Sequence, residues 1–503
     1  MEPYTNEIKT ALQNYGNNPT LLYNALKSIH TTAYGNGHRV VYPSGENFNI
    51  SIPNSGECIP LSSDTDFNGC IFNVTNNSSN PQNWCFLFKL RPDSSKYLIL
   101  DDPIDKSKLK KGACIYGSTQ HPLDSNPKML LVKDDNLWTQ RTIGLGTTNE
   151  YRSDLLLLKD NVVQNDPIAS YENSNESNLV FNHVDIDFSQ KSVRNVTMVR
   201  KAASTTVTNF ILVEDLYNVL LENISVNSEN NSDLFTDNIF YFQRCMKLKV
   251  VNVSVNNTYS SVQNYGYAFT LDTVTDSYFE RICAAHAAKG VFAGNNVNKF
   301  TIVNSCVNRV DVHNYGRDFT CIDCTFRNTM NQQNVFNRFA SFFGKLKYIN
   351  CFFDEFLPVR LDSDYNAFTP FDLYMENCIM KVLHVSGTQS YTYNCLIHTL
   401  TIPNTTTGGQ VDAYSKCLPN VFVSGLKLLF PMAVTDMSVF KIMNKPYTGS
   451  FNYMSMLIFE AYATKQVTFS DVSGCTIRLS NPLTQAFINM PQQSATYNIT
   501  GGS

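Results

Sequence analysis

A short apolar run that ends at a corner residue, followed by a small or apolar side chain, recurs through the middle of the chain. The residue after the corner is found at Ile224, Val253, Ile282, Ser305, Cys324, Cys351, Cys378 and Cys395. The spacing varies from 29 residues, between the first two of these positions, to 17 residues, between the last two. A repeat whose core persists while its spacing changes indicates a solenoid, in which one face is fixed and the connecting loops vary in length.

The repeating units are predicted to be strands. Helical repeats need apolar residues three and four positions apart over ten or more residues, whereas here short alternating runs are interrupted by Asn, Gly and Asp. In LKYINCFF, residues 346–353, the alternation of Leu346 and Tyr348 shifts by one residue before Cys351 and Phe353. The shift indicates a corner, where a left-handed backbone is needed and stacked side chains can hydrogen-bond from rung to rung. The predicted corner ladder consists of Asn223, Asn252, Asn304, Asp323, Asn350, Asn377 and Asn394.

Charge and hydropathy exclude several classes of function. The net charge is −4 and no run of five or more like charges occurs, which argues against nucleic acid and anionic membranes as partners. No apolar stretch is long enough for a membrane span, and Glu2 and Glu7 lie where an export signal needs a basic start. The chain is therefore expected to stay in the cytoplasm where it is made, with its 14 cysteines as free thiols. No metal or other cofactor is expected, because the CxxC at Cys321 and Cys324 has no second ligand pair.

Three segments are predicted. Residues 1–34 show helical spacing and form an N-terminal helical cap or docking segment. Residues 35–425 form the β solenoid, and residues 426–503 form a C-terminal β domain, because the strand-like runs there lack the Asn corner. The fold class is all-β.

The corner ladder and the opening HRVVYPSGENFNISIP, residues 38–53, resemble the right-handed parallel β-helix of the pectate lyase-like superfamily. With a short N-terminal cap, a C-terminal β domain and no export signal, the chain resembles bacteriophage tailspikes and tail fibres. The resemblance implies a homotrimer in the virion tail, assembled in the host cytoplasm. It further implies contact with host cell-surface polysaccharide and with other tail or baseplate proteins, and no membrane insertion.

The resemblance leaves the activity open. One alternative is a tail appendage that degrades the polysaccharide, as a glycoside hydrolase or polysaccharide lyase acting on capsule or O-antigen. The others are a non-catalytic structural tail subunit and a bacterial polysaccharide lyase or glycoside hydrolase.

Glycoside hydrolysis needs two carboxyl groups roughly 5 to 9.5 Å apart, a separation that adjacent rungs or alternate strand positions both provide. In VDVHNYG, residues 310–316, Val310 and Val312 are expected to point inward, which places Asp311 and His313 outward on an exposed strand. Together with acids and arginines of other rungs, they are predicted to form a stripe along one face that binds an extended glycan. The catalytic candidates are Asp311, Asp362, Asp364 and Asp272, and the substrate-binding candidates are His313, Tyr315, Arg338, Arg360 and Tyr365.

Each of these residues also has an ordinary structural interpretation. Outward polar side chains keep a solenoid in solution, and opposite charges on neighbouring rungs form cross-strand pairs. Asp323 is expected to serve only as a corner, and Cys321 and Cys324 are expected to fill the core.

Overall fold

A computed structural model gives the fold. It describes residues 4–53, 58–61, 64–76, 86–91, 98–99, 104–115, 126–141, 148–171, 174, 179–201, 209–229, 238–256, 267–284, 290–327, 336–339, 342–361, 371–381, 395–399, 419–429, 436–442, 466–472, 476–477 and 496–502. These residues form two compact units. Unit 1 contains Met1–Leu131, Leu155–Asp166 and Phe181–Ala293, and unit 2 contains Val132–Asp154, Pro167–Val180 and Gly294–Ser503.

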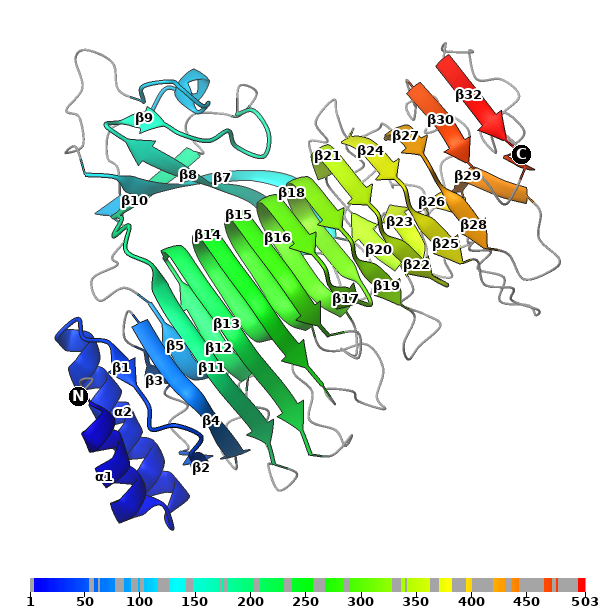
Figure 1. The fold of residues 1–503 in the computed structure, drawn as a ribbon. Helices are drawn as coiled ribbons and strands as arrows, with labels where there is room; N and C mark the ends of the chain where they lie inside the picture. Colours follow the sequence, from blue (N-terminus) through cyan, green and yellow to red (C-terminus); the bar gives the residue numbers. More distant parts are fainter. Residues whose placement is uncertain are drawn as a thin grey trace. The chain divides into compact units, whose positions relative to one another are not determined.

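Two helices cover the first strands of unit 1 (Figure 1). They are α1 (Thr5–Tyr15) and α2 (Pro19–Gly35), which confirms the helical spacing predicted at the N-terminus. Helix α2 begins with proline, and the side chain of Asn18 accepts a hydrogen bond from the Leu21 N–H at 3.2 Å. Its buried face packs on β2 and β3, where His30 Nε2 and the Tyr42 hydroxyl share a hydrogen bond of 2.8 Å. The helices thus cover a sheet edge that would otherwise be open.

The strands of unit 1 lie side by side in parallel (Figure 1). A column of buried residues in register, Val196, Ile224, Val253 and Ile282, runs through β11, β13, β14 and β15, which confirms the repeat. The strands are β1 (Val40–Val41), β2 (Asn47–Ile52), β3 (Ile59–Pro60), β4 (Asp64–Asn76), β5 (Phe86–Leu90), β11 (Lys191–Arg200), β12 (Asn209–Glu214), β13 (Tyr217–Ser228), β14 (Asn238–Val255) and β15 (Tyr267–Cys283). Strand β16 (Gly290–Val303) reaches the first residues of unit 2.

Unit 2 continues the same architecture. Ile322, Ile349 and Glu376 are in register on β18, β21 and β24, while Cys324, Cys351 and Cys378 are buried just beyond the corner. Its strands are β17 (Cys306–Val307), β18 (Val310–Ile322), β19 (Thr325–Arg327), β20 (Phe336–Phe339), β21 (Phe342–Ile349), β22 (Phe352–Asp354), β23 (Leu357–Leu361), β24 (Phe371–Glu376), β25 (Ile379–Lys381) and β26 (Cys395–Thr399). The fold is a parallel β-helix.

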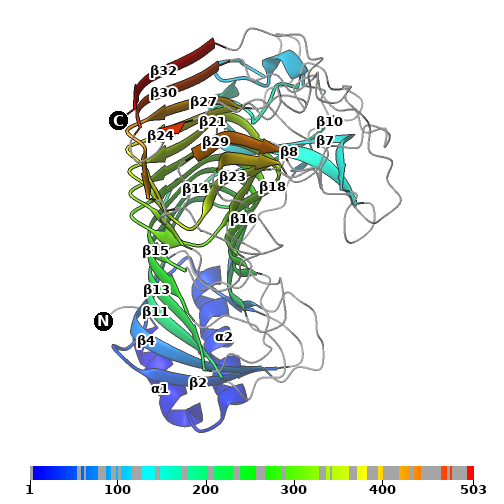
Figure 2. The ribbon, with the colours of Figure 1, turned by 90° about the vertical axis from the view of Figure 1, so that its right-hand side faces the viewer.

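Parallel pairing continues beyond residue 420. Leu373 and Met375 of β24 are in register with Val421 and Val423 of β27, and Figure 2 shows β24, β27, β30 and β32 stacked in order. The last strands are β27 (Asn420–Ser424), β28 (Lys427–Leu429), β29 (Asp436–Ile442), β30 (Gln466–Val472), β31 (Thr476–Ile477) and β32 (Thr496–Gly502). Gly425, with φ +66°, occupies the corner after β27 in place of asparagine. A separate domain over 426–503 stays a prediction.

Five rungs, those with ladder positions 223, 252, 281, 304 and 323, have three left-handed corners each rather than one. In the predicted ladder, Asn252 Nδ2 donates to Asn223 Oδ1 at 2.8 Å, and Asn350 Nδ2 donates to Asp323 Oδ1 at 3.0 Å. Positive φ angles occur in this ladder at Asn223, Asn252, Asn304, Asp323, Asn350 and Asn377. Two further columns, five and eight residues before the ladder, also have positive φ: Asn218, Lys247, Asp276, Lys299 and Asp318, and Asp215, Arg244, Thr273, Asn296 and Tyr315. Asn394 lies outside the described residues.

A small separate sheet interrupts the solenoid between β5 and β11. Its strand order is β6 (Leu98–Ile99), β10 (Leu179–Asp185), β7 (Lys128–Arg141), β8 (Thr148–Lys159) and β9 (Val162–Val163). A short 3-10 helix, η1 (Lys106–Lys108), lies between β6 and β7 in sequence. Within the described part of the chain, neither helix has the length and apolar character to span a membrane.

Candidate functional site

The corner that follows β12 gathers polar side chains in unit 1. Asp215 accepts two hydrogen bonds from Arg244 of the next rung, Nε to Oδ1 at 2.5 Å and Nη2 to Oδ2 at 3.2 Å. Beside it, Glu214 forms an ion pair of 2.7 Å with Lys89. Because Asp215 and Arg244 occupy equivalent left-handed corners, this bidentate pair links neighbouring rungs at their turn.

Asp272 lies on the same column as Glu214, two rungs away, with Gln243 in register between them. The Asp272 carboxylate accepts hydrogen bonds from the Tyr241 hydroxyl at 3.3 Å and from Gln243 Nε2 at 3.2 Å. The sequence-predicted candidate Asp272 is therefore half-buried in a hydrogen-bonded position, and the carboxylate of Glu214, two rungs away, was not predicted from the sequence.

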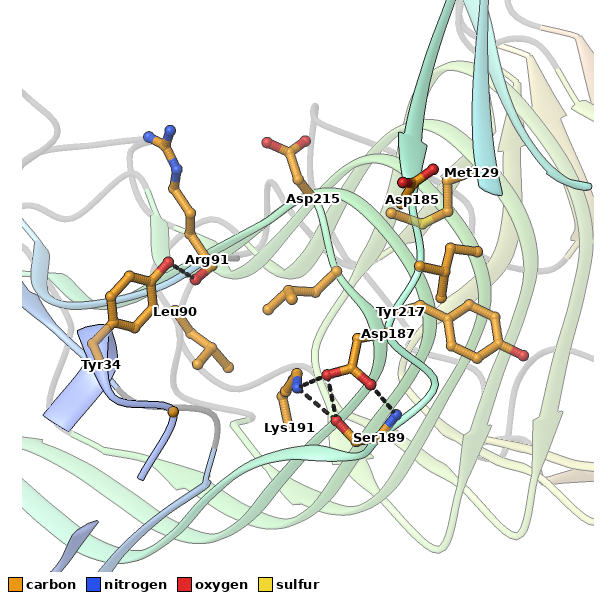
Figure 3. A pocket seen from close by; sticks show the side chains of 13 residues that line it. Tyr34, Leu90, Arg91, Met129, Asp185, Asp187, Ser189, Lys191, Asp215 and Tyr217 are labelled. Carbon is orange, nitrogen blue, oxygen red and sulfur yellow. Dashed lines mark hydrogen bonds and ion pairs between the residues drawn. The ribbon is translucent and has the colours of Figure 1, made fainter. Parts of the chain in front are cut away.

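A pocket of about 570 Å³ opens beside Asp215 (Figure 3). That volume lies in the range of about 300–1,000 Å³ in which proteins bind small ligands. The lining combines apolar side chains with charged ones from α2–β1, the end of β5, β7, the segment from β10 to β11 and the corner between β12 and β13. It includes Tyr34, Leu90, Arg91, Met129, Asp185, Ile186, Asp187, Ser189, Lys191, Asp215, Leu216 and Tyr217, all of unit 1.

Each carboxylate of the pocket is accompanied by a cation. Asp185 is ion-paired with Lys128, and Asp187 with Lys191, while Asp215 has Arg244. Hydrogen bonds from Lys191 and Ser189 lower the pKa of Asp187 to about 2. Asp187 is therefore ionised at neutral pH and can accept hydrogen bonds from a ligand, but it cannot donate a proton.

Two tyrosines shape the pocket. The Tyr34 hydroxyl donates to the carbonyl of Arg91 at 2.5 Å, which fixes the backbone where the Arg91 side chain begins. Tyr217 packs edge-on against Phe188, with ring centroids 5.1 Å apart, and Lys247 Nζ lies 5.2 Å from its centroid. Leucine, isoleucine and methionine side chains complete an apolar surface between the charged groups (Figure 3).

The structure brings three of the predicted site residues together in unit 2, but not at an exposed surface. His313 Nε2 lies 2.9 Å from Asp311 Oδ2, Arg338 Nε lies 3.7 Å from Asp311 Oδ1, and Arg309 is ion-paired with the same carboxylate. Asp311 is 0% exposed, so the expectation of an exposed strand is wrong. Val310 and Val312 are buried as predicted, and the opposite face of the strand is covered as well.

The electrostatics of this cluster are those of a buried ion pair. Burial alone would oppose ionisation of Asp311, but the charges of Arg309, His313 and Arg338 outweigh it and hold its pKa well below the usual value. Arg338 is in register with Arg360, a partly exposed residue on the next rung. The other candidates, Asp362, Asp364 and Tyr365, lie outside the described residues.

Tyr315 is also buried, contrary to the expectation that it holds a ligand at the surface. It occupies a left-handed corner, with φ +56°, from which its hydroxyl donates to Asp154 Oδ2 at 3.1 Å and accepts from the Ala169 N–H at 3.1 Å. Asp154 additionally accepts from the Tyr171 hydroxyl at 2.7 Å and the Ile168 N–H at 2.8 Å. This network joins the inserted segment to β18 within unit 2.

A second buried pair supports the same segment. Arg152 Nε donates to Asp134 Oδ2 at 3.0 Å, and its guanidinium lies 4.4 Å from the centre of the Tyr171 ring. Burial raises the pKa of Asp154 to about 6, against the opposing effect of its hydrogen bonds. These residues were not predicted from the sequence, since they belong to an irregular region with no repeat.

The pocket in unit 1 was likewise not predicted from the sequence. One signal was available, because HVDIDFSQK, residues 183–191, alternates two acids with apolar residues and ends in a lysine. The other contributors come from segments far apart in sequence, such as Tyr34, Arg91 and Tyr217. Among the described residues, no group of three or more His, Cys, Asp or Glu side chains is arranged to hold a metal ion.

A capped parallel β-helix with hydrogen-bonded corners and an inserted sheet defines the class of protein, and solved structures of the same fold include bacteriophage tailspikes. One is the tailspike of Pseudomonas phage LKA1, with 12% identity, a TM-score of 0.50, and coverage of 90% of this chain and 74% of that one. Another is the tailspike of Acinetobacter baumannii bacteriophage AP22, solved with an A. baumannii capsular saccharide, with 10% identity, a TM-score of 0.54, and coverage of 94% and 70%. At these identities the similarity is one of fold. No protein-family model and no curated protein matches the sequence.

Proposed function

We propose that this chain is a bacteriophage tail appendage that binds host cell-surface polysaccharide in the pocket of unit 1. The observation that carries the proposal is the pocket itself, in which ionised groups alternate with apolar side chains. Sugar rings present hydroxyl groups at their edges and C–H groups on their faces, so a lining with both kinds of surface suits them. The fold shared with a tailspike solved with a capsular saccharide supports the same function.

The pairing of the acids favours binding over chemistry at the pocket. A carboxylate held by a cation accepts hydrogen bonds from hydroxyl groups, but it lacks the raised pKa that a general acid needs. Asp187, with its pKa lowered to about 2, is the clearest case.

Cleavage of the bound glycan is a second candidate function, favoured by Glu214 and Asp272. Their strand positions are two rungs apart, or roughly 9.6 Å at a strand spacing of about 4.8 Å. That is near the upper end of the separation of about 6.5–9.5 Å at which two carboxyl groups admit a water molecule for inversion.

Binding is tested with immobilised capsular and O-antigen polysaccharides from a panel of bacterial hosts, using biolayer interferometry on the full chain. Wild-type protein is expected to bind one of these polymers, and Asp187→Ala and Lys191→Ala are expected to weaken that binding about tenfold or more. Lys381→Ala, at an exposed ion pair in unit 2, is the matched control and should bind normally. If all three variants bind the polymer as tightly as the wild type, the polysaccharide does not bind in this pocket.

Cleavage is tested on the polymer that binds, by measuring new reducing ends. Asp272→Asn and Glu214→Gln are expected to abolish release while leaving binding intact. Release that persists in both variants would remove this pair, and no release by the wild type would leave a non-catalytic adhesin.

The assembly belongs to the same proposal. A tail appendage of this kind is expected to be a homotrimer located in the virion tail and joined to other tail or baseplate proteins. Mass photometry of the purified chain should show three copies, and a monomer at micromolar concentration would count against the trimer.

A further inference from the structure

Among the described residues, one cation in the lining of the unit 1 pocket has no carboxylate partner. The three carboxylates that line it each have an intramolecular cation: Asp185 has Lys128, Asp187 has Lys191 and Asp215 has Arg244. The bidentate geometry at Asp215 uses both of its oxygens, and Asp187 also accepts from Ser189. The acids of the pocket therefore need no cation from a ligand.

Arg91 is the remaining charged residue of the lining. It is exposed, and among the described residues its guanidinium has neither an ion pair nor a hydrogen bond. The backbone carbonyl of Arg91 accepts a hydrogen bond of 2.5 Å from the Tyr34 hydroxyl. The side chain extends to the same side of the pocket as Asp215 (Figure 3).

Glu214 could pair with Arg91 only if its ion pair with Lys89 were broken. Glu214, one residue before Asp215, is held at 2.7 Å by Lys89 of β5, and Arg91 follows directly after that strand ends at Leu90. The Glu214 carboxylate is therefore already balanced by a lysine. Arg91 is thus an exposed cation in the lining of a pocket whose other charges are balanced.

We propose that the pocket takes a carboxylate-bearing saccharide, a uronate, and that Arg91 is the residue that recognises its carboxylate. The inference rests on the proposed function and names the class of glycan. A guanidinium binds a carboxylate through two parallel hydrogen bonds, and a single surplus positive charge matches a single carboxylate. A phosphate monoester, with a charge of about −1.5 to −2 near neutral pH, would exceed it.

The experiment uses monosaccharide probes on the full chain, followed by saturation-transfer NMR and titration. The probes are glucuronate, galacturonate and mannuronate, their neutral counterparts glucose, galactose and mannose, and glucose 6-phosphate. At least one uronate is expected to bind at least tenfold more tightly than its neutral counterpart, and binding should weaken as salt is raised. Arg91→Ala should remove the preference, and Arg91→Lys should restore it only in part, because lysine lacks the planar fork.

The matched control is Arg327→Ala, which removes an exposed, ion-paired arginine of unit 2 and should leave the preference unchanged. Equal binding of uronates and neutral sugars, tighter binding of glucose 6-phosphate, or an unchanged preference in Arg91→Ala would overturn the inference. Failure of every probe would also overturn it. If the protein still binds a host polysaccharide in that case, the proposed function stands and only the uronate assignment falls.

Discussion

Two acids of the unit 1 pocket, Asp185 and Asp187, and two acids of unit 2, Asp311 and Asp154, have different surroundings. In unit 1, the side chains of Asp185 and Asp187 are 64% and 63% exposed, although their partners Lys128 and Lys191 are only 3% and 13% exposed. In unit 2, Asp311 is 0% exposed between two arginines and a histidine, and Asp154 is buried among tyrosines. An exposed pair is weak and can exchange a partner for a ligand, whereas a buried pair cannot be opened without leaving a charge in the interior. Exposure, more than residue type, separates the candidate binding surface from the internal supports.

The largest expected effect tests the buried side of this comparison. Asp311→Ala leaves Arg309 and Arg338 buried without their shared carboxylate, and should cost about 3–5 kcal/mol of stability. The measurement is thermal and urea unfolding of the purified chain. A loss below about 1 kcal/mol would mean that the cluster is hydrated in solution.

The next prediction concerns pH. The pKa of Asp154 is raised from 3.8 to about 6, so the folded state keeps its proton where the unfolded chain has lost it. Stability from this group is fully present below pH 4 and declines as pH rises to about 6, by about 3 kcal/mol at roughly 1.4 kcal/mol per pKa unit. Melting temperatures from pH 4 to 7 should fall less steeply in Asp154→Asn than in the wild type. Identical slopes would contradict the raised pKa.

A smaller effect is expected at the corner tyrosine. Tyr315→Phe removes the hydrogen bond to Asp154 and leaves the Ala169 N–H without its acceptor, at a cost of about 1–3 kcal/mol. Tyr278→Phe, at a partly exposed tyrosine of unit 1, is the control and should be close to neutral. The free energy of unfolding of both variants is measured by chemical denaturation. Equal values for the two variants would show that the Tyr315 hydroxyl does not stabilise the fold.

Gly425→Ala should cost about 1–2 kcal/mol, because a non-glycine residue at φ +66° is strained and its Cβ would lie 2.4 Å from Asn377 Oδ1. The expected loss is measured by thermal unfolding, with an alanine substitution at the non-strained Ser424 as control. A neutral Gly425→Ala would show that the corner relaxes easily at this end of the ladder.

The smallest effect completes the comparison. Asp187→Ala removes a carboxylate that is 63% exposed but leaves Lys191, which is 13% exposed, without its ion pair; it should cost no more than about 1 kcal/mol of stability, although it weakens glycan binding. A loss comparable with that of Asp311→Ala would erase the distinction between the two units.

The sequence predicted the fold well because a solenoid repeats its signal. The phase shift at Asn350 and the buried cysteines beyond it follow from local alternation alone, and they are found where expected. Gly425 was not recognised as a corner because the pattern had been defined by asparagine, although glycine adopts the same conformation more easily.

The sites were less predictable, for two physical reasons. Strand parity identifies the two faces of β18 but not what covers them, so Asp311 was assigned correctly to a face and wrongly to solvent. The pocket of unit 1 combines residues from five segments that are far apart in sequence, and no local pattern links one segment to another. Only the tertiary fold places Arg91 and Asp215 in the lining of the same pocket.

The corner ladder has a consequence for how such a chain can change. Each corner amide bonds only to the rung beside it, as Asn252 does to Asn223, so the rise from rung to rung is set at the corners and not by the length of the intervening segment. Segments between corners already differ, from 29 residues between Asn223 and Asn252 to 19 between Asn304 and Asp323. Surface loops within these segments can therefore change in length or sequence while the corners and the buried strand residues stay the same.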